Sequence, residues 1–139
     1  MTAYMLLRRA NIAYRGRDAR RSIDLAAAAH QHIDGVDHHV LALAAQQEAR
    51  GWAALGDYEH AGPLLDQAAT LLSGADVPAP DAPAYAHHYG LAVLEDQRAT
   101  CLRDAGQPEQ AIVLYERHLS EIPAHNTRDR GYRCAQLAR

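Results

Sequence analysis

Two segments of equal length decide how this chain is expected to fold: ALAAQQEARGWAALGDYEHAGPLLDQAATLLSGA, residues 42–75, and AVLEDQRATCLRDAGQPEQAIVLYERHLSEIPAH, residues 92–125. Aligned without gaps, the two segments match in residue size and type at five positions. A small residue stands at position eight, a large one at eleven, glycine at fifteen, alanine at twenty and a large residue at twenty-four. In that order the pairs are Ala49 and Ala99, Trp52 and Leu102, Gly56 and Gly106, Ala61 and Ala111, and Leu65 and Tyr115.

This pattern is typical of two antiparallel helices joined by a tight bend. Small residues let the helices cross closely, and large residues fill the gaps beside the crossing. Glycine accepts the positive φ that the bend requires. Asp57 is expected to cap the second helix of the first copy, and Gln107-Pro108 to start the equivalent helix of the other copy. Each segment is therefore predicted to be one helical hairpin.

The hairpin pattern resembles the tetratricopeptide repeat family, in which such pairs stack into a solenoid. Pro123 stands where that pattern expects proline. The copies are degenerate, because positions four and seven lack the usual aromatic residue and leucine. The resemblance implies an all-α, tetratricopeptide-like helical-hairpin solenoid.

A weaker repeat precedes the two clear ones, since Asp18 aligns with Asp57 as a helix cap. Extra residues between the clear repeats fall in SGADVPAPDAPAYAH, whose three prolines mark a loop insertion. We expect a single domain, 1–139, of about three repeats plus one unpaired terminal helix. Its parts are a degenerate repeat 1–36, a repeat 42–75, a loop insertion 73–87, a repeat 92–125 and a partial repeat 128–139.

The last predicted helix, residues 128–139, has no partner in the repeat pattern. A solenoid that ends on half a hairpin exposes an apolar face. Truncation, pairing with a second copy as a homodimer, or a designed end would each explain it.

Composition favours an ordinary folded protein, with 48 % hydrophobic and 22 % charged residues and a formal net charge of −3. No apolar run reaches the roughly 18 to 20 residues that a membrane helix needs, and the N-terminus does not resemble a signal peptide. We therefore expect no membrane association and a cytoplasmic location. Residues 1–21 carry six arginines against one acidic residue, Asp18, which a solvated helix face explains as well as a nucleic-acid contact.

Catalytic and metal-binding patterns are missing from the sequence. The histidine clusters at 30 and 32, 38 and 39, and 87 and 88 lack the helical spacing that makes zinc ligands converge. Cys101 is expected to be a packed thiol, and no phosphate-binding loop is present. The run Asp57 to His60 reads as a capped turn. We expect neither an enzyme nor a cofactor.

A repeat solenoid instead offers a concave groove lined by the first helix of each hairpin. Groove positions recur at the second, fifth, ninth, twelfth and thirteenth places of the repeat. The candidate ligand or partner residues are Tyr4, Asn11, Tyr14, Gln46, Arg50, Asp96, Thr100 and Arg103. Arg50 and Arg103 are expected to hold any anionic ligand, since a guanidinium can bind a carboxylate with two hydrogen bonds.

The sequence also resembles the C-terminal repeat region of actinobacterial Xre-type helix-turn-helix transcriptional regulators. That resemblance is carried by AYMLLRRANIAYRGRDARRSIDLAAAA, by LEDQRATCLRDAGQPEQAIVLYERHL and by the ending RDRGYRCAQLAR. It implies a sensory or protein-interaction domain that takes a peptide, a small-molecule effector or a partner protein. We expect no direct nucleic-acid binding by these residues. The alternative is a self-associating structural scaffold.

Overall fold

A computed structural model describes residues 3–31, 38–73 and 91–121. This part of the chain contains six α-helices and no strand, so the all-α prediction is confirmed for it. The helices are α1 (Ala3–Arg15), α2 (Ala19–Gln31), α3 (His38–Ala54), α4 (Tyr58–Ser73), α6 (Leu91–Asp104) and α7 (Pro108–Glu121). The expected loop 73–87, after its first residue, and the expected helix 128–139 lie outside these residues.

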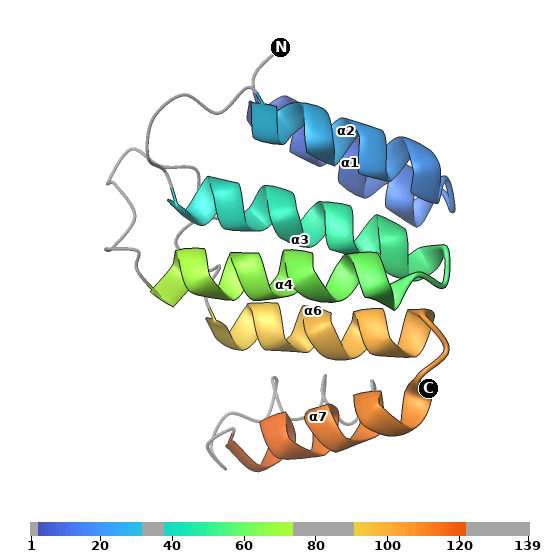
Figure 1. Cartoon of the computed structure of the whole chain (residues 1–139), viewed down its shortest axis with the longest axis vertical. Coiled ribbons are helices and arrows are strands. Elements are labelled where there is room, and N and C mark those ends of the chain that lie inside the picture. The colour runs from blue at the N-terminus through green and yellow to red at the C-terminus, as the bar shows by residue number, and fades with distance from the viewer. Residues whose placement is uncertain (1–2, 32–37, 74–90, 122–139) are drawn as a thin grey trace.

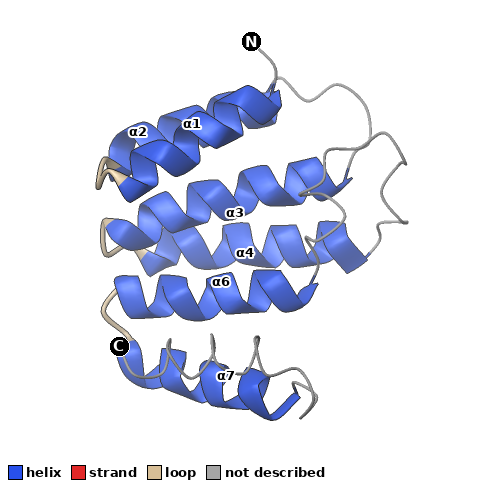
Figure 2. Ribbon diagram, turned by 180° about the vertical axis from the view of Figure 1, so that it is seen from behind, coloured by secondary structure: helices blue, strands red, loops and turns tan. Residues whose placement is uncertain are grey.

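The helices stack in chain order, from α1 and α2 at one end to α7 at the other (Figures 1 and 2). Consecutive helices pack as the pairs α1–α2, α3–α4 and α6–α7. Neighbouring pairs touch through α2–α3, α4–α6 and α3–α6. Helix α3 therefore has packing partners on several sides, and it also contacts α1.

The two helices of each pair are joined by a turn with the same backbone conformation in all three pairs. In each turn, three successive N–H groups donate to carbonyls four, three and five residues earlier, which is the hydrogen-bond pattern of a Schellman helix end. The middle residue of the turn has a positive φ, of 82° at Gly56 and 85° at Gly106. The expected role of these two glycines is confirmed. At the first turn the same position is Arg17, with a φ of 64°, a conformation that costs an L-residue about 1–2 kcal/mol.

Capping residues then start the second helix of each pair. Asp18 Oδ1 accepts from the N–H of Arg21, and Asp57 Oδ1 accepts from the N–H of His60, both at 3.1 Å. Pro108 opens α7, where its missing N–H has no helical partner to lose. The predicted helix starts are confirmed.

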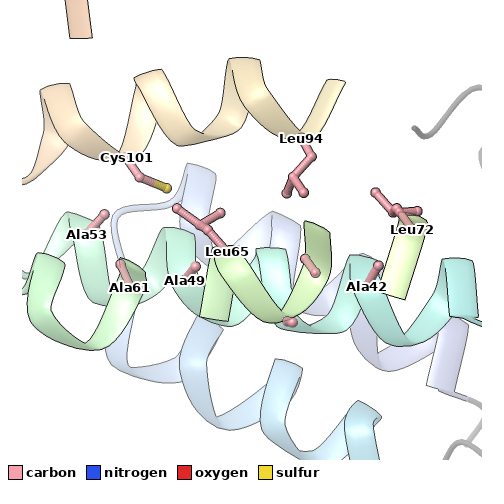
Figure 3. Packing of buried hydrophobic residues seen from close by; sticks show 10 residues of the cluster. Ala42, Ala49, Ala53, Ala61, Leu65, Leu72, Leu94 and Cys101 are labelled. Carbon is pink, nitrogen blue, oxygen red and sulfur yellow. The ribbon is translucent and has the colours of Figure 1, made fainter. Parts of the chain in front are cut away.

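The predicted crossing residues are buried. Ala49, Ala99 and Ala61 have no exposed surface. Leu65 of α4, packed against α3 and α6, has none either (Figure 3). Figure 3 shows Cys101 on α6 directed into this same cluster. Small residues at the crossings and a few larger side chains between them therefore make the core, as the pattern predicts.

Helices α2 and α3 approach each other closely at Gly51. A Cβ at this position would lie 2.5 Å from Ile23 Cγ1 and 3.1 Å from the carbonyl oxygen of Ala19. A side chain at residue 51 would therefore require α2 or Ile23 to shift.

Candidate ligand-binding face

Side chains from α1, α3 and α6 meet in one network. The Tyr14 hydroxyl on α1 donates to Asp104 Oδ2 on α6 at 2.7 Å, although 90 residues separate them. Between them, the Arg50 guanidinium of α3 lies 4.0 Å from the centre of the Tyr14 ring, within the range of a cation–π interaction. The first helices of three successive pairs thus share one polar surface, which we call the Tyr14–Arg50–Asp104 network.

Arg50 is tied to the fold through its other contacts. Its Nη1 donates to Asn11 Oδ1 and to Gln47 Oε1, each at 3.3 Å. Its Nε is buried and has no hydrogen-bond partner, and such an unpaired donor costs about 1–3 kcal/mol. Arg50 therefore keeps one unused donor, while its remaining contacts hold α1 against α3.

Tyr14 stays protonated over the ordinary pH range. Burial, followed by the hydrogen bond to the Asp104 carboxylate, raises the pKa of Tyr14 from 10.0 to about 12. A phenol held protonated is a hydrogen-bond donor, which is what the carboxylate needs. Because the pKa is raised in the folded state, the stability from this contact is complete below pH 10 and is lost as the pH rises towards 12.

On α6 the other predicted residues face α7 or their own helix. The His118 ring Nδ1 lies 3.0 Å from Asp96 Oδ1, and the Thr100 hydroxyl lies 2.8 Å from the Tyr115 hydroxyl. Arg103 Nε donates to Asp104 Oδ1 over 3.5 Å. These contacts join α6 to α7 and extend the network along α6.

The structure brings four of the eight predicted residues together. Asn11, Tyr14 and Arg50 are in direct contact, and Arg103 joins them through Asp104. Asp96 and Thr100 instead bond to α7. Tyr4 belongs to α1, but its side chain lies outside the part of the chain that the structure describes.

The prediction that Gln46 lies exposed in a groove is wrong. Gln46 is 3 % exposed, and Ala53, which occupies the twelfth place of the repeat 42–75 and is therefore also an expected groove position, is fully buried. Helix α3 packs against α1, α2, α4 and α6, so Gln46 and Gln47 are buried along with its apolar residues. The Oε1 atom of Gln46 is left without a hydrogen-bond partner.

An open cavity of about 720 Å³ adjoins the network at the end of the stack where the turns lie. Its wall combines the α1–α2 turn with the last residues of α3 and α6. The lining residues are Tyr14, Arg15, Arg17, Asp18, Ala19, Arg20, Ala54, Leu55 and Asp104. Sequence reasoning did not find this cavity, although the excess of arginine in residues 1–21 marked its basic side.

The run that begins at Asp57 ends the turn between α3 and α4 and starts α4. Asp57 caps α4 and also lies 2.6 Å from His60 Nδ1 through its other carboxylate oxygen. The His60 ring stacks on Trp52 with their centres 4.4 Å apart. Asp57 and His60 therefore contact the turn and the end of α3, while Tyr58 packs against the core.

Cys101 is fully enclosed in the core, and burial raises the pKa of its thiol from 9.0 to about 12. It is thus a packing residue at neutral pH. Across the described ranges, no three His, Cys, Asp or Glu side chains are arranged to hold a metal ion. None of the six described helices is both long enough and apolar enough to cross a membrane.

Comparison with known proteins gives no match: no protein-family model, no curated protein and no solved structure is significantly similar to this chain.

Proposed function

We propose that this chain is a non-enzymatic binding module, built as a tetratricopeptide-like solenoid. The face formed by the first helix of each pair, α1, α3 and α6, would take a ligand or a partner.

The observation that supports this proposal is the Tyr14–Arg50–Asp104 network. Helices that follow one another along a straight stack lie about 8–10 Å apart. A direct hydrogen bond from α1 to α6 past α3 therefore favours a stack that bends towards this side. Repeat proteins use such concave surfaces to bind elongated or irregular partners.

The residues on this face suit a polar ligand with some apolar surface. They offer an aromatic ring, amide oxygens and guanidinium groups rather than a nucleophile with a nearby base. A peptide, a small-molecule effector or a partner protein fits this chemistry. The resemblance to Xre-type regulators suggests that this module is the sensory or protein-interaction part of a bacterial transcriptional regulator.

A thermal-shift screen of the whole chain against defined hexapeptides and common metabolites would test the proposal. Each compound that raises the melting temperature is then titrated by calorimetry into the wild type and into an Arg50→Ala/Arg103→Ala variant. We expect at least a tenfold loss of affinity in the double variant, because hydrogen bonds to charged groups contribute about 1.5–3 kcal/mol each. Arg117→Ala on the exposed surface of α7 is the control. An absence of compounds that bind, or equal affinity in all three proteins, would count against a binding face.

Self-association is the second candidate, and exposed apolar side chains on α7 favour it. Ile112 is 43 % and Val113 is 56 % exposed. Light scattering distinguishes the two functions. A monomer at tens of micromolar supports the binding module. A dimer that dissociates in the Val113→Glu variant supports a self-associating scaffold.

A further inference from the structure

Three arginines surround the cavity beside the α1–α2 turn: Arg15 at the end of α1, Arg17 in the turn, and Arg20 in the first turn of α2. The cavity volume, about 720 Å³, falls within the range of roughly 300–1,000 Å³ that is usual for small-molecule sites.

Basic side chains outnumber acidic ones in the wall of this cavity, with Arg15, Arg17 and Arg20 against Asp18 and Asp104. Within residues 3–31, 38–73 and 91–121, Arg15 and Arg17 make no ion pair or side-chain hydrogen bond. The two lining carboxylates are already engaged: Asp18 caps α2, and Asp104 accepts from Tyr14. An anion entering the cavity would therefore meet free guanidinium groups.

Arg17 supplies an independent indication. The equivalent residues of the other two turns, Gly56 and Gly106, reach positive φ without strain. Arg17 adopts the same backbone at an energetic cost, and its side chain lines the cavity. Strained residues of this kind cluster at ligand sites, where the rest of the fold compensates for them.

The remaining wall is apolar and partly aromatic. Leu55, which is 47 % exposed, and Ala54 line it from the end of α3. The Tyr14 ring lines it from α1. Arg20 is placed by Trp52, because its guanidinium carbon lies 5.7 Å from the centre of that ring. The site therefore pairs a basic rim with an apolar surface.

We propose that this cavity binds a small organic anion, in which a phosphate or carboxylate is attached to a flat apolar body. The oxyanion contacts Arg15, Arg17 and Arg20, since guanidinium groups bind both oxyanions with paired hydrogen bonds. The apolar body lies against Leu55 and the Tyr14 ring. This inference rests on the proposed function, because it names a ligand class for a binding module. It places the ligand in the cavity at one end of the network, where Tyr14 and Asp104 form part of the wall.

Calorimetric titration of the whole chain with phenyl phosphate, benzoate and inorganic phosphate tests the inference. Phenyl phosphate and benzoate distinguish the two oxyanions, and inorganic phosphate measures what the apolar body adds. We expect saturable binding of at least one aromatic anion, with inorganic phosphate at least tenfold weaker. Arg17→Gln should weaken the aromatic anion about tenfold, the usual loss when one charged hydrogen-bonding partner is removed.

Arg21→Gln is the matched control, because it removes the same charge from an exposed residue of α2 that does not line this cavity. We expect it to change the affinity less than twofold. Circular dichroism and the melting temperature establish that both variants fold.

Two outcomes would overturn the inference: no saturable binding of either aromatic anion, or an equal loss of affinity in Arg17→Gln and Arg21→Gln. The second result would mean that overall charge, and not this site, attracts the anion. Failure here leaves the proposed function standing if the peptide and metabolite screen finds a ligand that Arg50→Ala/Arg103→Ala weakens. If the peptide and metabolite screen finds no ligand but an aromatic anion binds as expected, binding is limited to the cavity.

Discussion

The α1–α2 and α3–α4 hairpins have the same turn, hydrogen bond for hydrogen bond, but build it from different residues. Where α3–α4 has Gly56 at positive φ, α1–α2 has Arg17. Where α3–α4 has Ala61 at the crossing, α1–α2 has Ser22, whose hydroxyl is buried without a partner. The comparison shows that the same turn backbone forms both with residues that favour its conformation and with residues that do not. Of these two unfavourable residues, Arg17 alone lines a cavity in the described part of the chain.

The largest difference between the hairpins lies in their cores. Eight residues after the capping aspartate, α4 has Leu65 while α2 has Ala26, and both are fully buried. Leu65→Ala should therefore lower the free energy of unfolding by about 2–5 kcal/mol, since it leaves a cavity between α3, α4 and α6. Urea unfolding followed by circular dichroism measures this. A loss below 1 kcal/mol would show that Leu65 does not fill the centre of the core.

The contact between the hairpins is the next test. Gly51→Ala should destabilise the protein by roughly 1–3 kcal/mol, although alanine is the better helix former, because its Cβ would collide with Ile23. Ile23→Ala removes the colliding atom. A double-mutant cycle should then show that Gly51→Ala costs much less in the Ile23→Ala background. Additive losses would mean that Ile23 Cγ1 is not the obstacle and that the backbone of α2, with the Ala19 carbonyl oxygen 3.1 Å away, limits the approach.

Exchanging the residues at positive φ tests whether the two turns are equivalent. Gly56→Arg should destabilise the protein by about 1 kcal/mol, the cost of placing an L-residue in the left-handed region. Arg17→Gly should stabilise it by about 0.5–1 kcal/mol, because relief of that strain exceeds the added freedom of glycine in the unfolded chain. Thermal unfolding should give shifts of opposite sign for the two variants. Shifts of the same sign would mean that the turns are not equivalent.

The smallest expected effect is at the crossing of α1 and α2. Ser22→Ala should stabilise the protein by about 0.5–1 kcal/mol, since it removes a buried hydroxyl that lacks a partner and improves helix propensity. The matched change in the other hairpin, Ala61→Ser, should destabilise it. Chemical denaturation of both variants checks the pair, and a destabilised Ser22→Ala would reveal that the hydroxyl is in fact bonded.

Much of the helical framework could be predicted from the sequence because its signals are local. Gly56, Gly106 and the caps Asp18 and Asp57 mark the turns within a few residues, and small residues mark the crossings. The candidate site depends on contacts between distant segments, so it was predicted only in part.

Three features of the site show where sequence reasoning ended. The contact of Tyr14 with Asp104 depends on how three helix pairs are oriented, which no single repeat encodes. The burial of Gln46 depends on the number of helices around α3. Asp18 located the first turn, but only the backbone shows that Arg17 has a positive φ beside a cavity.

The most direct test of the arginine cavity is one variant with two readouts. Arg17→Gly is measured for thermal stability and, on the same sample, for affinity towards the aromatic anion that binds the wild type more tightly. We predict that it melts at a higher temperature and binds that anion about tenfold more weakly, because strain is relieved while a charged contact is lost. A variant that is more stable and binds with unchanged affinity would contradict a role for Arg17 in the cavity.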